Sequence, residues 1–349
     1  MKPKLLVMPA DQGGCGNYRI LLPARTMARN HISEWVVESN VWFDPNKLSK
    51  LNPTHIVCQR QTEETQYAAL KVAKLFGKAQ IIYDLDDLLW EVPTYNSYKK
   101  YFKHTNKKVL RSFLIESDQV TCSTVPLAEE IKKLSGVTPD IVPNYIRGSD
   151  YRLPQNRSGE KLRVGWAGSA THKDDLSLME NAITHSLDKV EWHFLGYIPT
   201  YLKGKVVEHP YVPVDQYVQS LHALNLDVAI APLQVNRFNE CKSNLKLIEF
   251  GAIGLPVITT DVYPYQQNPG IKIKNGKNAW QSWLEAILLY ANDEARRMED
   301  AINTFEYSAI FSLDLPMNIT NIASAWKMHS YKSSYSFLQK SDLSVVSGG

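Results

Sequence analysis

The sequence is poor in several features that would assign it to familiar classes of protein. It has four cysteines in 349 residues and no CxxC pair, which argues against a disulfide framework or a structural zinc site. No apolar run approaches the roughly 18 residues that span a bilayer, and the N-terminal apolar run is too short for a signal peptide. We therefore expect a cytoplasmic protein with reduced thiols and no integral membrane association.

Charge and composition set weaker bounds. The formal net charge is only +3, so electrostatics over the whole chain neither demand nor exclude a polyanionic partner. Hydrophobic residues make up 44% and charged residues 21% of the chain, as in ordinary globular proteins. A chain of 349 residues can bury two separate cores, and we expect two domains.

Short apolar runs alternate with helical patterns along the chain. In the first part, strands are expected at residues 5–9, 35–38, 55–59, 79–84, 120–123 and 140–143, with helices at 18–29, 63–76 and 126–134. In the second part, strands are expected at 162–167, 191–195, 206–207, 226–231 and 257–259, with helices at 215–224, 245–253, 280–290, 293–307 and 319–326. Strands separated by helices imply parallel sheets. We predict an α/β protein with two doubly wound, Rossmann-like domains.

A polar, irregular stretch at residues 147–161 marks the expected domain boundary. The first domain is then 1–150 and the second 151–302. Residues 333–349 are rich in serine and are expected to form a polar tail.

The segment 242–258 is the most informative part of the sequence, because it combines a polar turn, a short helix, a Gly-Pro stop and a buried strand. Ser243 or Asn244 can cap the helix, whose free N–H groups and positive dipole end favour a phosphate. Lys246 and Glu249 lie three residues apart on one face, where a surface ion pair is the ordinary alternative. We expect a nucleotide diphosphate here, with the Glu249 oxygens suited to a vicinal diol such as a ribose.

Ligands of open α/β sheets bind beyond the carboxyl ends of the strands, so functional residues are expected in the loops that follow strands. Gly13, Gly14 and Gly16 follow the first strand, where glycines let backbone N–H groups approach a ligand. This loop matches neither the Rossmann fingerprint nor a Walker A loop, and a plain tight turn is the alternative.

The loop that opens the second domain offers another set of ligand contacts. Gly168 and Ser169 permit close approach of the backbone, and Lys173 could place its ammonium on a phosphate. An ordinary strand-to-helix loop with a surface lysine is equally consistent with the pattern. His172 is a weaker candidate for substrate contact.

Three carboxylates, Asp84, Asp86 and Asp87, follow another strand of the first domain. Clustered acids repel one another unless they serve a cation, a hydroxyl or helix N–H groups. A solvated helix N-terminus is the structural alternative to a functional role.

These residues resemble the nucleotide-sugar-dependent glycosyltransferases of the GT-B fold, in particular the large retaining group related to bacterial glycan synthases. The match covers most of the chain. Its strongest part is the run from Glu249 to Ile258, EFGAIGLPVI, which is similar to the family's E-A-x-A-x-G-x-P-V-I. Gly168-Ser169 and the glycines at 13–16 add to it.

The resemblance implies a nucleoside diphosphate sugar as donor and no required cofactor. By resemblance, Glu249 binds the nucleotide ribose and Lys246 and Lys173 face the diphosphate, while the glycines 13, 14, 16 and 168, Ser169 and the backbone at Ser243, Asn244 and Leu245 contact the donor. The resemblance also implies that helices at 303–332 cross back to the first domain. The family's second glutamate, which faces the donor sugar, is replaced here by Cys241, and the neighbouring Glu240 could substitute for it.

The implied reaction transfers the sugar to an acceptor hydroxyl with retention of anomeric configuration. The leaving diphosphate can accept the acceptor's proton, so the protein mainly positions the substrates and neutralises charge. Lys246 and Lys173 would do the latter, and Asp86 and Asp87 would orient or deprotonate the hydroxyl. We expect no metal to be needed, because lysines and helix dipoles replace it.

The acceptor is expected at a basic, aromatic segment, residues 95–108, with the sequence YNSYKKYFKHTNKK. Its candidate contacts are Tyr95, Tyr98, Lys99, Lys100 and Lys103. Lysines there could contact phosphates and tyrosines could stack on bases. An anionic membrane surface with a lipid-linked glycan, or a solvated helix face, would suit the same composition.

The compact size and the N-terminal loop also look like glycosyltransferases of bacterial viruses, some of which modify hydroxymethylated bases in DNA. Double-stranded DNA with modified cytosine is therefore one predicted partner, and a cell-envelope glycan is the alternative. A metal-dependent transferase built on the DxD-like Asp84-Leu85-Asp86, and a binding module that has lost catalysis, are the rival hypotheses.

Overall fold

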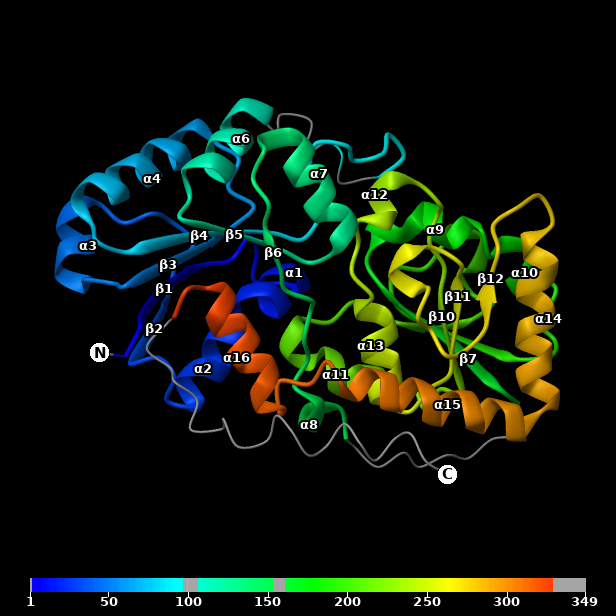
Figure 1. Cartoon of the computed structure of the whole chain (residues 1–349). Coiled ribbons are helices and arrows are strands. Elements are labelled where there is room, and N and C mark those ends of the chain that lie inside the picture. The colour runs from blue at the N-terminus through cyan, green and yellow to red at the C-terminus, as the bar shows by residue number, and fades with distance from the viewer. Residues whose placement is uncertain (1, 97–98, 100–105, 153–160, 329–349) are drawn as a thin grey trace, which may run out of the picture.

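The computed structural model describes residues 2–96, 99, 106–152 and 161–328, which form two α/β lobes side by side (Figure 1). The first lobe contains a six-stranded sheet in the order β2-β1-β3-β4-β5-β6. Its strands are β1 Lys4–Met8, β2 Trp35–Glu38, β3 His55–Gln59, β4 Gln80–Leu85, β5 Gln119–Cys122 and β6 Asp140–Ile141. All of the paired strands run parallel.

Helices cover both faces of this sheet (Figure 1). They are α1 Gly14–Gly16, α2 Leu22–Arg29, α3 Pro45–Leu51, α4 Glu64–Phe76, α6 Lys107–Glu116 and α7 Val125–Ser135, with α8 Gly148–Tyr151 leading out of the lobe. The single helix predicted at 18–29 is in fact a π-helical turn, Asn17–Leu21, followed by α2. Helices α1, α3, α6 and α8 were not predicted.

Local sequence explains the clearest of these elements. Helix α7 begins where the Thr124 hydroxyl accepts a hydrogen bond from the Leu127 N–H, with Pro126 in the first turn. It ends at Gly136, whose φ of 81° is the left-handed conformation that stops helices.

The second lobe repeats the plan with the sheet order β12-β11-β10-β7-β8-β9. Its strands are β7 Arg163–Gly168, β8 Glu191–Gly196, β9 Val207–His209, β10 Val228–Ala231, β11 Val257–Thr260 and β12 Lys272–Ile273. Its helices include α9 Lys173–Ser177, α10 Glu180–Thr184, α11 Val214–Ala223, α12 Arg237–Glu240, α13 Leu245–Ala252 and α14 Ala279–Asn292. The prediction of two doubly wound parallel sheets is confirmed, although the short edge strand β12 was missed.

The last helices connect the lobes. Helix α15, Glu294–Ala309, packs across α13 so closely that a Cβ on Gly251 would lie 2.6 Å from the Thr304 carbonyl oxygen. Helix α16, Pro316–Ala325, then returns to the first lobe, where Ile322 and Trp326 join a core that includes Leu5. Figure 1 shows this return beside α2. The predicted tail, 333–349, lies outside the described residues.

Candidate functional site

A cavity of about 490 Å³ lies between the two lobes. Loops after β1, β3 and β4 form its first-lobe side, and loops after β7 and β8 together with the start of α13 form its second-lobe side. Its lining includes Asp11, Gly13, Gly14, Cys15, Tyr18, Arg60, Asp87, Asn96, Gly168, Ser169, Thr171, His172, Tyr211, Tyr217, Phe238, Lys242, Leu245, Lys246 and Glu249. The carboxyl ends of both sheets therefore face one shared site.

The start of α13 brings a helix N-terminus to this cavity. The predicted side-chain cap is wrong, because the helix has no side-chain cap hydrogen bond. Ser243 Oγ accepts from the Asn144 amide at 2.8 Å, and the Asn244 amide donates to the Tyr307 hydroxyl at 2.8 Å. Both side chains are held by distant partners, and no side chain in the described ranges accepts from the first backbone N–H groups of the helix.

Lys246 lies in the first turn of α13 and lines the cavity. Its ammonium donates to the Ala167 carbonyl oxygen and lies 5.3 Å from the centre of the Trp166 ring. Among the described residues, no carboxylate oxygen forms an ion pair with it. Burial lowers the pKa of Lys246, and the positive charge of Lys242 lowers it further, against the opposing effect of Glu249. A cation in this position would be stabilised by an incoming anion.

Glu249 also lines the cavity, although its residue is only 4% exposed. Three tyrosines surround its carboxylate, and two donate to it: Tyr18 of the first lobe at 2.5 Å and Tyr217 at 3.3 Å. The Tyr18 hydroxyl lies 3.0 Å from that of Tyr151. Burial raises the pKa of Glu249, partly offset by Lys246 and the tyrosine hydroxyls. The carboxylate is thus an interlobe contact as well as a cavity group.

Lys242 was not predicted as a site residue, whereas Lys173 was. Lys242 lines the cavity, and its Nζ lies 3.2 Å from Asp87 Oδ1 of the other lobe. Lys173 is exposed at the first residue of α9 and is not part of the lining. The predicted lysine pair of the site is therefore replaced by Lys246 and Lys242, which are four residues apart.

The acidic loop is locked by arginines of its own lobe. Asp84 is fully buried and forms a bidentate pair with Arg19, with N–O distances of 2.6 and 3.1 Å. Asp86 pairs with Arg60, whose guanidinium also donates to Asp87 at 2.5 Å. Because both carboxylates of the DxD-like pair already bind guanidinium groups, the geometry disfavours the hypothesis that this pair holds a catalytic metal ion.

Asp87 and Asp86 occupy different environments. Asp87 lines the cavity, whereas Asp86 does not. Burial raises the pKa of Asp86 despite the opposing effect of Arg60. Burial also acts on Asp87, but Lys242 and Arg60 outweigh it and the pKa of Asp87 is lowered. Of these two carboxylates Asp87 alone lines the cavity, and its lowered pKa keeps it ionised at neutral pH.

One set of three described side chains near the acidic loop could in principle hold a cation. One ligand atom each from Cys15, Asp86 and Asp87 all lie within 4.8 Å of one another. Burial raises the pKa of the Cys15 thiol to about 12. A thiol that stays protonated, beside carboxylates already bound to Arg60 and Lys242, is a poor ligand set.

The glycine loop after β1 is organised by Asp11. Its Oδ1 accepts from the N–H groups of Gly13 at 2.8 Å and Gly16 at 3.0 Å. Gly13 and Gly14 line the cavity, but Gly16 does not. A Cβ on Gly16 would lie 1.8 Å from the Asp11 carbonyl oxygen, so this glycine is required by the tight turn. The structure places Gly16 behind the site and not on it.

The loop after β7 contributes Gly168, Ser169 and His172 to the cavity. The Ser169 hydroxyl lies 2.7 Å from that of Thr171. His172 Nδ1 lies 2.9 Å from a carboxylate oxygen of Asp175, and burial lowers the pKa of the imidazole despite this partner. His172 therefore meets the cavity as a neutral imidazole at neutral pH.

Glu240 does not take the place of the family's sugar-facing glutamate in this structure. It lies outside the cavity lining and pairs with Arg237 at 3.2 Å. Cys241 is fully buried among residues of the first lobe, and its carbonyl oxygen accepts from the Thr124 hydroxyl at 2.8 Å. Cys241, which stands where the family has its sugar-facing glutamate, is therefore an interlobe contact in this protein.

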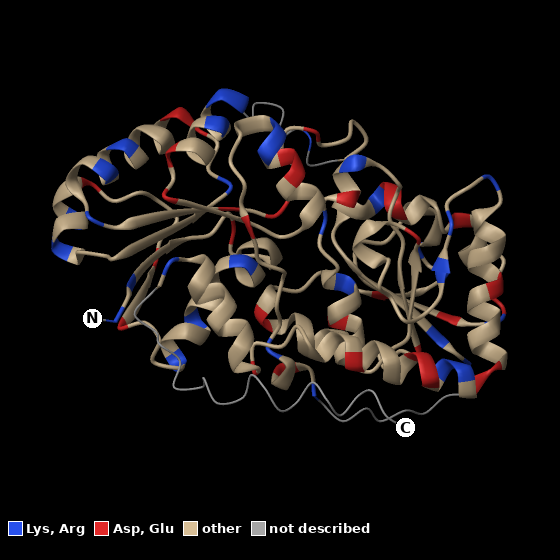
Figure 2. Ribbon diagram, viewed as in Figure 1, with Lys and Arg blue, Asp and Glu red and all other residues tan. Residues whose placement is uncertain are grey.

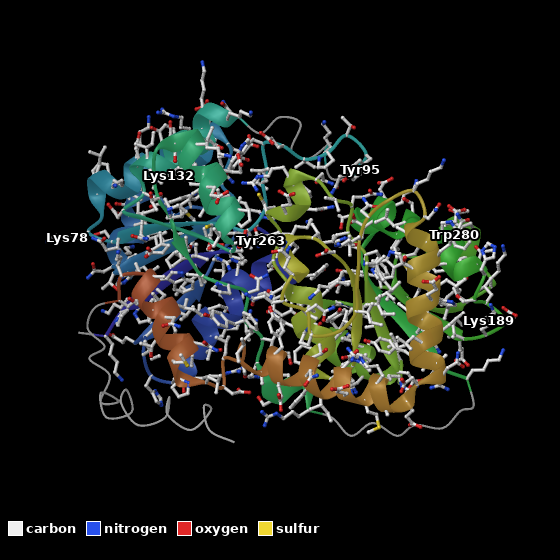
Figure 3. All side chains as sticks on the ribbon, turned by 45° about the vertical axis from the view of Figure 1, so that its right-hand side comes forward. Lys78, Tyr95, Lys132, Lys189, Tyr263 and Trp280 are labelled. Carbon is white, nitrogen blue, oxygen red and sulfur yellow. The ribbon has the colours of Figure 1, made fainter. Side chains whose placement is uncertain are left out.

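The predicted acceptor segment is only partly described. Tyr98, Lys100 and Lys103 lie outside the described residues, and Lys99 does not line the cavity. Tyr95 sits at the junction of the lobes (Figure 3), where its hydroxyl accepts from the Asn236 amide at 2.6 Å. Figure 2 shows Lys and Arg on α4 and α7 interspersed with acidic residues. These features do not single out a polyanionic acceptor.

No helix in the described part of the chain is long and apolar enough to span a bilayer.

Comparison with known proteins supports the architecture. No protein-family model matches the chain. A Bacillus subtilis (strain 168) protein named as a teichuronic acid biosynthesis glycosyltransferase, TuaH, is 27% identical over 216 residues, which cover 55% of this chain and 53% of that protein. The chain thus matches about half the length of this relative.

Two solved structures extend the comparison over nearly the whole chain. The structure of Anabaena Alr3699/HepE with UDP and glucose aligns with a TM-score of 0.65 and 11% identity, covering 93% of this chain and 99% of that one. An α-glucosyltransferase in complex with UDP and a 13-mer DNA aligns with a TM-score of 0.62 and 10% identity, with 93% and 99% coverage. The chain itself has two parallel six-stranded sheets that face one cavity. Together with the alignments, this arrangement shows the expected GT-B fold.

Proposed function

We propose that the protein is a glycosyltransferase that takes a sugar from a nucleoside diphosphate, with uridine diphosphate as the expected carrier. The observation that carries this proposal is the cavity between the GT-B lobes, where Lys246 and the start of α13 lie beside Glu249. UDP is present in both structures compared above, and the relative TuaH is named as a glycosyltransferase.

The donor would lie along the second lobe. Its diphosphate would accept hydrogen bonds from the free N–H groups at the start of α13, near Leu245, and from the Lys246 ammonium, which would leave the Ala167 carbonyl. The ribose hydroxyls would reach Glu249 on the side of the weaker, 3.3 Å contact with Tyr217. Gly168 and Ser169 line the same part of the cavity and let the phosphates approach the backbone.

The transfer itself needs little covalent chemistry from the protein. The acceptor hydroxyl oxygen forms a bond to the anomeric carbon as the bond from that carbon to the diphosphate breaks, on the same face, so that configuration is retained. The proton passes to the leaving diphosphate. Asp87 orients the hydroxyl, because its lowered pKa keeps the carboxylate ionised, so that it accepts a hydrogen bond but is only a weak base.

We infer that the acceptor is a glycan of the cell envelope. The teichuronic acid relative supports this class, since its 27% identity is well above the 10% of the DNA-bound glucosyltransferase, which supports only the fold. Modified cytosine in DNA remains the competing prediction.

A transfer assay tests the proposal. The purified protein is incubated with a panel of UDP-sugars and, in separate reactions, a lipid-linked glycan and duplex DNA containing hydroxymethylcytosine, followed by mass spectrometry. We expect the mass of one sugar to appear on the glycan. The same mass on the DNA base would show that the acceptor is modified DNA and not a glycan. Absence of both UDP binding and donor turnover would contradict the proposed function.

A further inference from the structure

Lys242 connects the two sides of the cavity. It belongs to the second lobe, between α12 and α13, and its Nζ contacts Asp87 Oδ1 of the first lobe at 3.2 Å. The same ammonium lies 4.5 Å from the centre of the Phe238 ring. Its side chain is 20% exposed, so it is neither free in solvent nor sealed in the core.

Asp87 has a second cationic partner besides Lys242. Arg60 donates to Asp87 Oδ2 at 2.5 Å and at the same time pairs with Asp86. The backbone of Arg60 has a φ of 51°, in the left-handed region, and its guanidinium contacts both carboxylates. Lys242 is thus the more easily released of the two cations on Asp87, because its contact is longer and it holds one carboxylate only.

Lys242 is also within electrostatic range of the predicted diphosphate position. It lines the same cavity as Lys246, and its charge acts on both Lys246 and His172. A diphosphate beside Lys246 would carry more charge than the single carboxylate that holds Lys242 now. Asp87 and the diphosphate would therefore compete for one ammonium group.

We propose that Lys242 is a positioning residue that links the two substrates: Asp87 holds it in the unliganded protein, and the donor diphosphate takes it over. This inference rests on the proposed function. Release of Lys242 frees Asp87 Oδ1 to accept a hydrogen bond from the acceptor hydroxyl, while Arg60 keeps Oδ2 in place. The donor then binds before the acceptor, because Oδ1 is occupied until the diphosphate arrives.

Binding of UDP, measured by titration calorimetry, tests the competition without any need for the acceptor. Asp87→Asn removes the competing charge, and we expect UDP to bind roughly three- to tenfold more tightly than to the wild type. Lys242→Met removes the ammonium, and we expect binding to weaken about tenfold, with recovery in Lys242→Arg. In the double variant Asp87→Asn/Lys242→Met, the gain from Asp87→Asn disappears.

Asp86→Asn is the matched comparison. It removes one carboxylate charge from the same loop, but the carboxylate that pairs with Lys242 stays in place. Its gain in UDP affinity should be less than half of that of Asp87→Asn. Thermal unfolding of each variant checks the fold, and Asp87→Ser replaces Asp87→Asn if the latter is unstable.

Two failures are distinguishable in this experiment. Equal or weaker UDP binding by Asp87→Asn, or a gain that persists without Lys242, would overturn the linkage and leave the donor site intact. Absence of UDP binding by the wild type would overturn the proposed function, and the linkage with it.

Discussion

The two lobes present opposite electrostatic arrangements to the cavity. In the first lobe, Asp84 and Asp86 are paired with arginines of that lobe, and Asp87 shares Arg60. In the second lobe, Lys246 donates to a backbone carbonyl and has no ion-pair partner among the described residues. A buried carboxylate that loses its cationic partner destabilises the fold, whereas a half-buried cation without a counter-ion favours an anionic ligand. This difference favours an anion site on the second lobe, with the first lobe as a fixed wall of the cavity.

The strongest test of this contrast concerns the stability of the first lobe. The side chains of Arg19 and Asp84 are 2% and 1% exposed, so Arg19→Met leaves a buried carboxylate without its partner. We expect the free energy of unfolding to fall by about 3–5 kcal/mol, measured by urea denaturation. Arg25→Met, which breaks an exposed pair with Glu38, should cost at most about 1 kcal/mol. Similar losses in both variants would remove the distinction between locked and exposed pairs.

A second test concerns the lysines of the second lobe. Lys246→Met should weaken UDP binding about 100-fold, because a half-buried, charge-assisted contact to the diphosphate is lost. Lys173→Met is the control, and its affinity should stay within about twofold of the wild type, since Lys173 is exposed outside the cavity lining. A comparable loss of affinity in Lys173→Met, measured by titration calorimetry, would return Lys173 to the diphosphate site, where the sequence predicted both lysines.

The pH dependence of UDP binding sharpens the same point. Burial lowers the pKa of Lys246 below that of an ordinary lysine, and the diphosphate prefers the protonated form. Affinity should therefore be constant below this pKa and fall above it, by up to about tenfold per pH unit, starting at a lower pH than for a solvent-exposed lysine. Lys246→Arg should flatten this alkaline fall. A wild-type profile without such a fall up to about pH 10 would show that Lys246 is not the group that binds the anion.

The smallest expected effect is that of metal removal. Because Arg60 and Arg19 occupy the carboxylate oxygens of Asp84 and Asp86, excess EDTA should leave both UDP affinity and sugar transfer unchanged. Loss of transfer that is restored by Mn²⁺ would instead support a metal-dependent reaction, with Cys15, Asp86 and Asp87 as the candidate ligands.

The sequence predicted the features that depend on local pattern. Apolar runs bounded by turns located most of the strands. Their alternation with helices predicted that the strands of both sheets run parallel. Lys246 and Glu249 reach the cavity as predicted, because their spacing on one short helix fixes their common face.

Contacts between distant residues could not be predicted in the same way. Tyr18 and Glu249 are 231 positions apart, and Arg19 and Asp84 are 65 apart, so no local pattern reveals either pair. The error at Lys173 has a different cause. That residue begins a short helix after a turn, where a shift of one position along the chain decides whether a side chain faces the cavity or the solvent.

The central claim is that a nucleoside diphosphate binds between the lobes with its phosphates on the second lobe. A crystal structure of the protein with UDP tests it most directly. The account predicts a phosphate oxygen within about 3.2 Å of Lys246 Nζ and of a backbone N–H at the start of α13, with a ribose hydroxyl on Glu249. UDP bound elsewhere, with Lys246 still on the Ala167 carbonyl oxygen and Glu249 still enclosed by its tyrosines, would contradict it.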